Sequence, residues 1–99
     1  MTPHVKIYMK FFGYKTAEEI MCEFCGSPAV DVHHLVPRSI APKDKVNKID
    51  NLMALCRIHH EQAHASKNTN DDFKYIHRRK CLQNGLPDNE KIIYEDHQI

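Results

Sequence analysis

Histidines are concentrated in two short stretches of this 99-residue chain. Two adjacent histidines, His33 and His34, end an apolar, alternating run, and a second histidine-rich stretch spans residues 59–64. Asn51 lies between them in the sequence. An imidazole can accept a proton near neutral pH and is a common metal ligand. The spacing allows these side chains to converge, so the chain has the residue types for metal-dependent acid–base chemistry.

Cysteines and one further histidine form two pairs with metal-ligand spacing. Cys22 and Cys25 form a C-x2-C-G turn, and Cys56 with His59 forms a C-x2-H pair. Zinc accepts thiolates and imidazole in a closed tetrahedron, so we predict a structural Zn²⁺ site made of these four residues. The alternatives are four unrelated buried residues or a redox-active C-x2-C pair. Cys81 has no partner at ligand spacing and is expected to be a small apolar residue on its helix.

The two histidine stretches raise a geometric question. His60 and His64 are four residues apart on a predicted helix over 56–65, so their rings project from one face. The histidine before His60 lies about 100° around that helix and is free to serve the zinc site. In a regular strand, His33 and His34 would point to opposite faces. Both can reach one site only if the strand ends or bends there.

Patterns of apolar, turn and capping residues predict the elements that would position these side chains. Proline at the first position, apolar spacing of three and four, and a following glycine predict an N-terminal helix. A capping box, Thr16-Ala17-Glu18-Glu19, predicts a short helical turn. The expected elements are a helix over 3–12, a strand over 29–35, a polar loop over 36–50, a second strand over 51–55 that pairs with the first, a helix over 56–65, an interruption at 67–70 and a C-terminal helix over about 71–84.

Composition is consistent with one small α+β domain over residues 1–99, with a core at 22–66 and a tail at 88–99 that has no strong signal. Residues 1–87 have a net charge of +4 and residues 88–99 of −3. The mildly basic part suits a polyanionic partner, although an ordinary solvated surface would look the same. No apolar run approaches the roughly 20 residues of a membrane span. No secretory signal is recognised, so a cytoplasmic location is the default expectation.

The ordered set of motifs resembles the HNH endonucleases and their ββα-metal core. The resemblance covers residues 22–64 and looks closest to small stand-alone HNH proteins of bacteria and their phages. The family often has Cys-x2-Cys-His where this chain has Cys56-Arg57-Ile58-His59-His60, and a histidine in place of the fourth cysteine keeps a zinc ligand. The motifs are Cys22-x2-Cys25, Asp31-Val32-His33-His34-Leu35-Val36-Pro37-Arg38-Ser39, Asn51-Leu52, Leu55-Cys56 and His60.

The resemblance implies a metal-dependent DNA endonuclease whose catalytic divalent ion (Mg²⁺, Mn²⁺, Ni²⁺ or Zn²⁺) is held by His33 and His60. His64 matches a third ligand that is found in the histidine-rich bacteriocin nucleases of the family and is less general. The implied general base, which takes a proton from the attacking water, is His34.

Two further residues receive roles from the same resemblance or from their position. The family implies that Asn51 holds the loop and the two strands in register by hydrogen bonds to backbone. Arg38, just beyond the first strand, could grip a neighbouring phosphate, with ordinary surface charge as the alternative. DNA is the expected partner. Two further possibilities are a second copy of the chain, in a homodimer, and phage packaging or replication proteins. The basic segment 78–80 could also contact backbone phosphate.

Two other functions compete with this interpretation. A non-catalytic zinc-finger module that binds nucleic acid would need only the zinc site and the basic residues. Residues 60–64 also fit the H-E-x-x-H pattern of zinc metalloproteases, with Glu61 as base, although no downstream third ligand is convincing. We expect His4, His77 and His97 to be surface or core histidines without a role.

Overall fold

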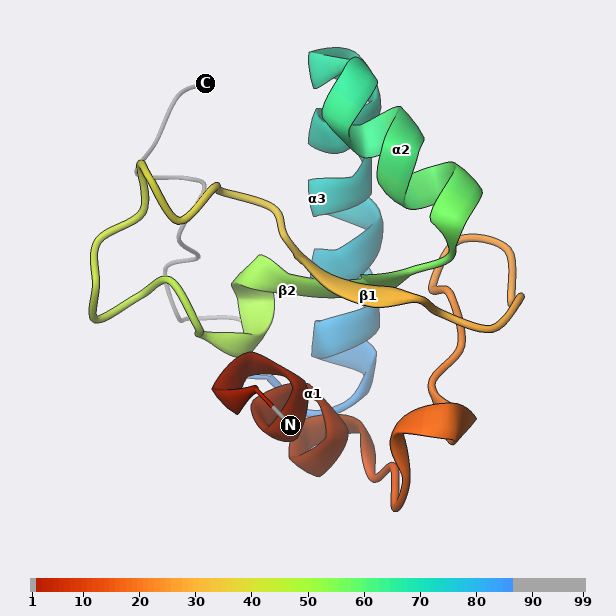
Figure 1. Cartoon of the computed structure of the whole chain (residues 1–99). Helices are drawn as coiled ribbons and strands as arrows, with labels where there is room; N and C mark the ends of the chain where they lie inside the picture. The colour runs from red at the N-terminus through yellow and green to blue at the C-terminus, as the bar shows by residue number, and fades with distance from the viewer. Residues whose placement is uncertain (1, 87–99) are drawn as a thin grey trace.

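Two short antiparallel strands lie at the centre of this computed structural model, which describes residues 2–86. Strand β1 (Asp31–His34) pairs with β2 (Leu52–Leu55), with His33 opposite Met53 and His34 opposite Leu52. Among the described residues, three α-helices surround this sheet, which confirms the predicted α+β class (Figure 1). The predicted tail at 88–99, with His97, lies outside the described residues.

Helix α1 (Pro3–Phe12) packs on one side of the sheet, and α2 (Arg57–Ala65) and α3 (Lys67–Gln83) cover the other (Figure 1). Proline begins α1, and Gly13 ends it in the left-handed conformation, with φ of +80°. Glycine reaches this conformation without the steric cost that a Cβ would add. Within residues 2–86, none of the helices combines the length and apolar character needed to cross a bilayer.

The core is divided by strand β2, whose four residues are all buried. Met53 and Leu55 face α2 and α3 in one apolar cluster, whereas Leu52 and Ala54 face α1 in another. A strand covered on both faces reads as a continuous apolar run rather than an alternating one. This explains the uninterrupted Leu-Met-Ala-Leu sequence of β2.

The predicted interruption at 67–70 is wrong, because α3 already begins at Lys67. The break between α2 and α3 is confined to Ser66, whose side chain accepts a hydrogen bond from the backbone N–H of Thr69 and so caps α3. Lys67 also pairs with Asp71, one turn further on, at 3.2 Å. A good N-cap and a favourable i, i+4 ion pair start a helix in a polar segment that has no apolar stripe.

The strands are shorter than predicted, and Asn51 lies in a 3-10 turn (Ile49–Asn51) just before β2. Its fully buried side chain fixes the long loop that joins the strands. The Asn51 Oδ1 accepts a hydrogen bond from the Val36 N–H at 2.7 Å, and its Nδ2 donates to the carbonyls of Val36 and Val46 at 3.2 and 2.9 Å. A single side chain therefore ties both ends of the loop together.

Candidate active site and metal centres

The four predicted zinc ligands lie together. Cys22, Cys25, Cys56 and His59 each offer one ligand atom, and these atoms lie within 4.8 Å of one another. The Sγ atoms of Cys25 and Cys56 are 3.8 Å apart, and Cys56 Sγ is 3.2 Å from His59 Nδ1. Two thiolates bound about 2.3 Å from a tetrahedral zinc ion would be about 3.8 Å apart. These residues could hold a structural zinc ion.

Local structure brings the two ligand pairs to one point. Gly26 adopts a φ of +78°, which turns the chain back behind the first pair. Cys56 is the N-cap of α2, and His59 lies in the first turn of that helix. Hydrogen bonds from the side chain and backbone of Ser27 lower the pKa of Cys25 to about 6. The thiolate, which is the form that binds zinc, therefore predominates at neutral pH.

A separate histidine cluster forms between β1 and α2. Ligand nitrogens of His33, His60 and His64 lie within 4.8 Å of one another, and the Nε2 atoms of the last two are 3.0 Å apart. Two nitrogens bound about 2.1 Å from one ion are about 3.0–3.4 Å apart, so this spacing fits a shared metal ion. Asp31 lies close by, with Oδ2 3.7 Å from His60 Nε2. The helical repeat separates His59 from this group, as predicted.

Asn70, in the first turns of α3, fixes the orientation of the His33 ring. Its Nδ2 donates to the Leu35 carbonyl at 2.9 Å, so its Oδ1 must face His33 Nε2, 2.8 Å away. Because an amide oxygen only accepts, His33 Nε2 bears the proton and Nδ1 is left to bind a metal ion. Burial, together with the nearby rings of His60 and His64, lowers the pKa of His33 to about 4. The ring is thus neutral at pH 7, as a ligand must be.

His34 is oriented by a different residue. Its Nε2 lies 2.9 Å from Asn47 Oδ1, which accepts a hydrogen bond from that nitrogen. The second ring nitrogen, Nδ1, is then free to accept a proton. Asn47 belongs to the loop that Asn51 holds through the adjacent Val46 carbonyl. The buried asparagine and the proposed base are therefore connected through a short segment of loop.

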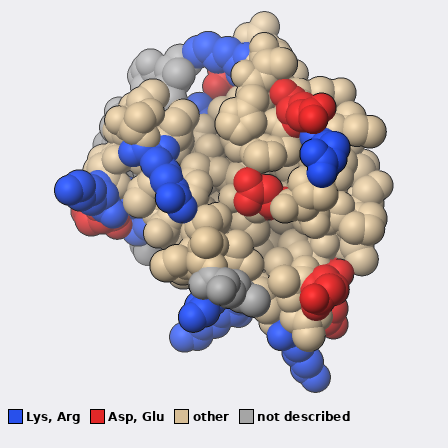
Figure 2. All heavy atoms as spheres, viewed as in Figure 1, with Lys and Arg blue, Asp and Glu red and all other residues tan. Residues whose placement is uncertain are grey.

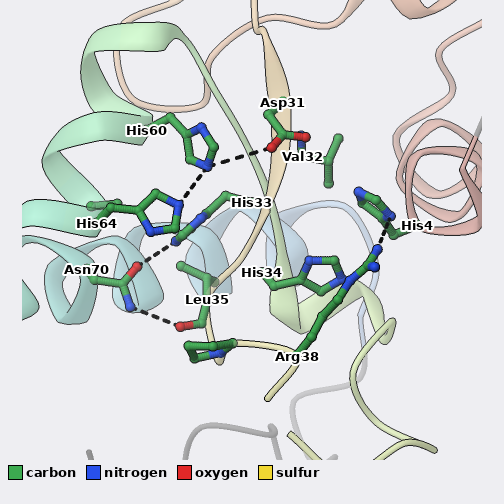
Figure 3. A pocket seen from close by; sticks show the side chains of 12 residues that line it. His4, Asp31, Val32, His33, His34, Leu35, Arg38, His60, His64 and Asn70 are labelled. Carbon is green, nitrogen blue, oxygen red and sulfur yellow. Dashed lines mark hydrogen bonds and ion pairs between the residues drawn. The ribbon is translucent and has the colours of Figure 1, made fainter. Parts of the chain in front are cut away.

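Both histidines of the doublet line one pocket of about 470 Å³. Figure 3 shows His33 facing the two α2 histidines on one side of β1, and His34 facing His4 and Arg38 on the other. Strand β1 ends at His34. The opposite-face rule for a strand holds, and both rings reach one site because the pocket crosses β1. The pocket is lined by His4, Asp31, Val32, His33, His34, Leu35, Pro37, Arg38, His60, Ala63, His64 and Asn70.

Three polar residues at this site were not predicted from the sequence. His4 was expected to have no role, but its ring lies against that of His34, with centroids 4.7 Å apart. Asn47 and Asn70 contact the two histidines of the doublet and were left among loop and interruption residues. Each contact joins residues at least 13 positions apart in the chain. Patterns such as C-x2-C and i, i+4 predict contacts only between residues that are close in the sequence, so they do not predict these contacts.

His77 is a core histidine, one of the two possibilities expected from the sequence. Its fully buried ring lies 2.8 Å from the Glu23 carboxylate, in a contact that joins α3 to the cysteine turn. Cys81 lies on α3 and is fully buried, in agreement with the small apolar residue that was expected on this helix, and its Sγ lies 3.3 Å from His77 Nε2. Glu61 is exposed and does not line the pocket, so the protease interpretation lacks its base at the histidine cluster.

Basic side chains are not gathered into one patch on the face that Figure 2 shows. Lys and Arg are distributed around this face with Asp and Glu among them. In the predicted basic segment 78–80, Lys80 lies over the ring of Phe12, 5.5 Å from its centroid. The surface charge alone therefore does not define a nucleic-acid binding face in this view.

Comparison with known proteins gives one match. Residues 22–66 match the family model described as HNH endonuclease. No curated protein and no solved structure matches the chain. The matched segment contains both ligand groups and the loop between the strands, whereas His4, in α1, and Asn70, in α3, lie outside it.

Proposed function

We propose that this protein, whose residues 22–66 match the HNH endonuclease family model, is a metal-dependent endonuclease that hydrolyses DNA phosphodiester bonds in the histidine pocket. The main support is the arrangement of the histidines around β1. Ligand nitrogens of His33, His60 and His64 lie close enough together to bind one ion, and His34 lines the same pocket without belonging to that group. A metal site with an adjacent unligated imidazole provides the two components that water-mediated phosphate hydrolysis needs.

His33, His60 and His64 would hold the catalytic divalent ion. Bound there, the ion would neutralise charge on the phosphate and support the leaving 3′ oxygen. The neutral form of His33 and the fixed position of its ring, through Asn70, suit this role. Cys22, Cys25, Cys56 and His59 would hold a separate zinc ion that stabilises the fold.

His34 acts as the general base. With its Nε2 hydrogen bonded to Asn47, its Nδ1 accepts a proton from the attacking water. The water oxygen forms a bond to phosphorus as the bond from phosphorus to the 3′ oxygen breaks. Asn51 is a positioning residue, because it fixes the loop from which Asn47 reaches the base. Arg38 lines the pocket beside His34 and would bind a phosphate oxygen of the substrate.

The test is cleavage of supercoiled plasmid by zinc-loaded protein with added Mg²⁺, Mn²⁺, Ni²⁺ or Zn²⁺. We expect His34→Ala to reduce the cleavage rate by about 10²–10⁴-fold, the typical contribution of a general base. Circular dichroism and zinc content should be unchanged. Glu61→Gln is the matched control, because this exposed residue of α2 lies outside the pocket, and it should cleave like the wild type.

Each alternative function predicts a different result. Full cleavage by His34→Ala would refute the assignment of the base. A wild-type protein that binds DNA but does not cleave it with any of the four metals would favour the non-catalytic zinc module. Peptide hydrolysis that is lost in Glu61→Gln would favour the protease.

A further inference from the structure

Helix α1 contributes a side chain to the pocket from outside the residues that match the family model. We propose that His4 is a positioning residue that holds the Arg38 guanidinium beside His34, where it binds a phosphate group of the nucleic-acid substrate. This inference rests on the proposed nuclease function, and it gives α1 a part in substrate binding as well as in the core.

The geometry shows a buried acceptor facing an exposed cation. His4 is only 7% exposed although it lines the pocket, and its Nδ1 lies 3.3 Å from Arg38 Nη2. Arg38 itself is exposed, in the turn that follows Pro37. The ring of His4 also lies against the ring of His34, with an angle of 49° between their planes. Figure 3 shows the three side chains together at one end of the pocket.

Protonation follows from this contact. A guanidinium has only donors, so the His4 Nδ1 must accept and the ring proton must lie on Nε2. Burial, with the nearby His34 and Arg38, lowers the pKa of His4, which agrees with a neutral ring. A protonated His4 would instead place a second cation against Arg38 and remove the acceptor.

The benefit of such a contact is preorganisation. A long arginine side chain loses rotamer entropy when it is fixed in one position. Because His4 occupies one donor of Arg38 before substrate arrives, part of this cost is met in the folded protein. The remaining guanidinium donors are left to bind two phosphate oxygens in the paired geometry that arginine favours.

Two substitutions of His4 separate the acceptor from the bulk of the ring. In His4→Asn, the side-chain oxygen can take the place of Nδ1, whereas His4→Leu keeps an apolar bulk without an acceptor. We would measure affinity for a fluorescent DNA duplex without added catalytic metal, and kcat/KM for plasmid cleavage with it. We expect Arg38→Ala and His4→Leu each to weaken binding by about tenfold, the scale of one charge-assisted hydrogen bond, and His4→Asn to retain most of the affinity.

The decisive measurement is the double variant. If His4 acts through Arg38, His4→Leu should have little further effect on binding in the Arg38→Ala background. Independent, multiplicative effects would overturn the proposal, as would equal losses in His4→Asn and His4→Leu or unchanged binding by Arg38→Ala. If His4→Leu does not fold, ¹⁵N NMR of the wild type decides, because a proton on Nδ1 of His4 would also overturn it. Failure of the nuclease function would instead appear as wild-type protein that binds the duplex but does not cleave the plasmid with any of the four metals.

Discussion

A buried ion pair between Glu23 and His77 connects the cysteine turn to α3. Both side chains are fully buried, with His77 Nδ1 2.8 Å from Glu23 Oε1. The other ring nitrogen of His77 lies 2.6 Å from the Ile49 carbonyl oxygen. The Tyr8 hydroxyl donates to the second oxygen of Glu23. Because both ring nitrogens face oxygen acceptors, the doubly protonated imidazolium satisfies every contact.

The protonation of His77 has a clear cause. Burial disfavours the imidazolium, but the contacts with Cys81 and Glu23 outweigh burial and raise the pKa of His77 to about 10. A pair with one partner removed leaves an uncompensated buried charge, which costs about 3–5 kcal/mol. We therefore predict that His77→Leu lowers the free energy of unfolding by this amount, a large part of the roughly 5–15 kcal/mol of a typical domain.

Urea unfolding of zinc-loaded protein, followed by far-UV circular dichroism, measures this effect. The double variant Glu23→Leu/His77→Leu is the control, because removing both charges should cost less than removing one. A raised pKa in the folded state stabilises the protein fully below about pH 6.5, the value for a free histidine, and this stabilisation is lost as the pH rises through the folded value of about 10. The difference between wild type and His77→Leu should shrink accordingly. A cost under about 1 kcal/mol would refute the ion pair.

Three further predictions concern the metal sites and the loop. Cys22→Ser should lose zinc and most of its folded structure, since structural zinc contributes about 10–16 kcal/mol in zinc-finger peptides; a folded variant with full zinc content would contradict the four-ligand site. Asn70→Ala should weaken Co²⁺ binding at the histidine cluster by about 10–100-fold in calorimetry, whereas the exposed neighbour Asn68→Ala should not. Asn51→Ala removes three hydrogen bonds to the loop and should lower the free energy of unfolding in urea by roughly 2–4 kcal/mol. If it lowered this free energy by less than the substitution of an exposed asparagine does, other contacts would have to hold the loop.

The sequence alone determined the features that depend on short-range geometry. The C-x2-C and C-x2-H spacings identified the four cysteine and histidine residues that cluster, because backbone turns fix the separation of such neighbours. The helical repeat separated His59 from His60, since adjacent residues on a helix point about 100° apart. The capping box at Thr16 also appears as predicted, with the Glu19 side chain accepting from the Thr16 backbone.

Only the tertiary structure determined which side chains, distant in the sequence, contact the histidines and the arginine of the pocket. The contact between His4 and Arg38 spans 34 positions, and that between His33 and Asn70 spans 37. These pairs meet only because α1 and α3 pack against opposite sides of the two-stranded sheet. The same packing places His33 and His34 on the two sides of β1 within one pocket. No local pattern encodes such contacts, because they follow from how the elements pack and not from the periodicity of any one of them.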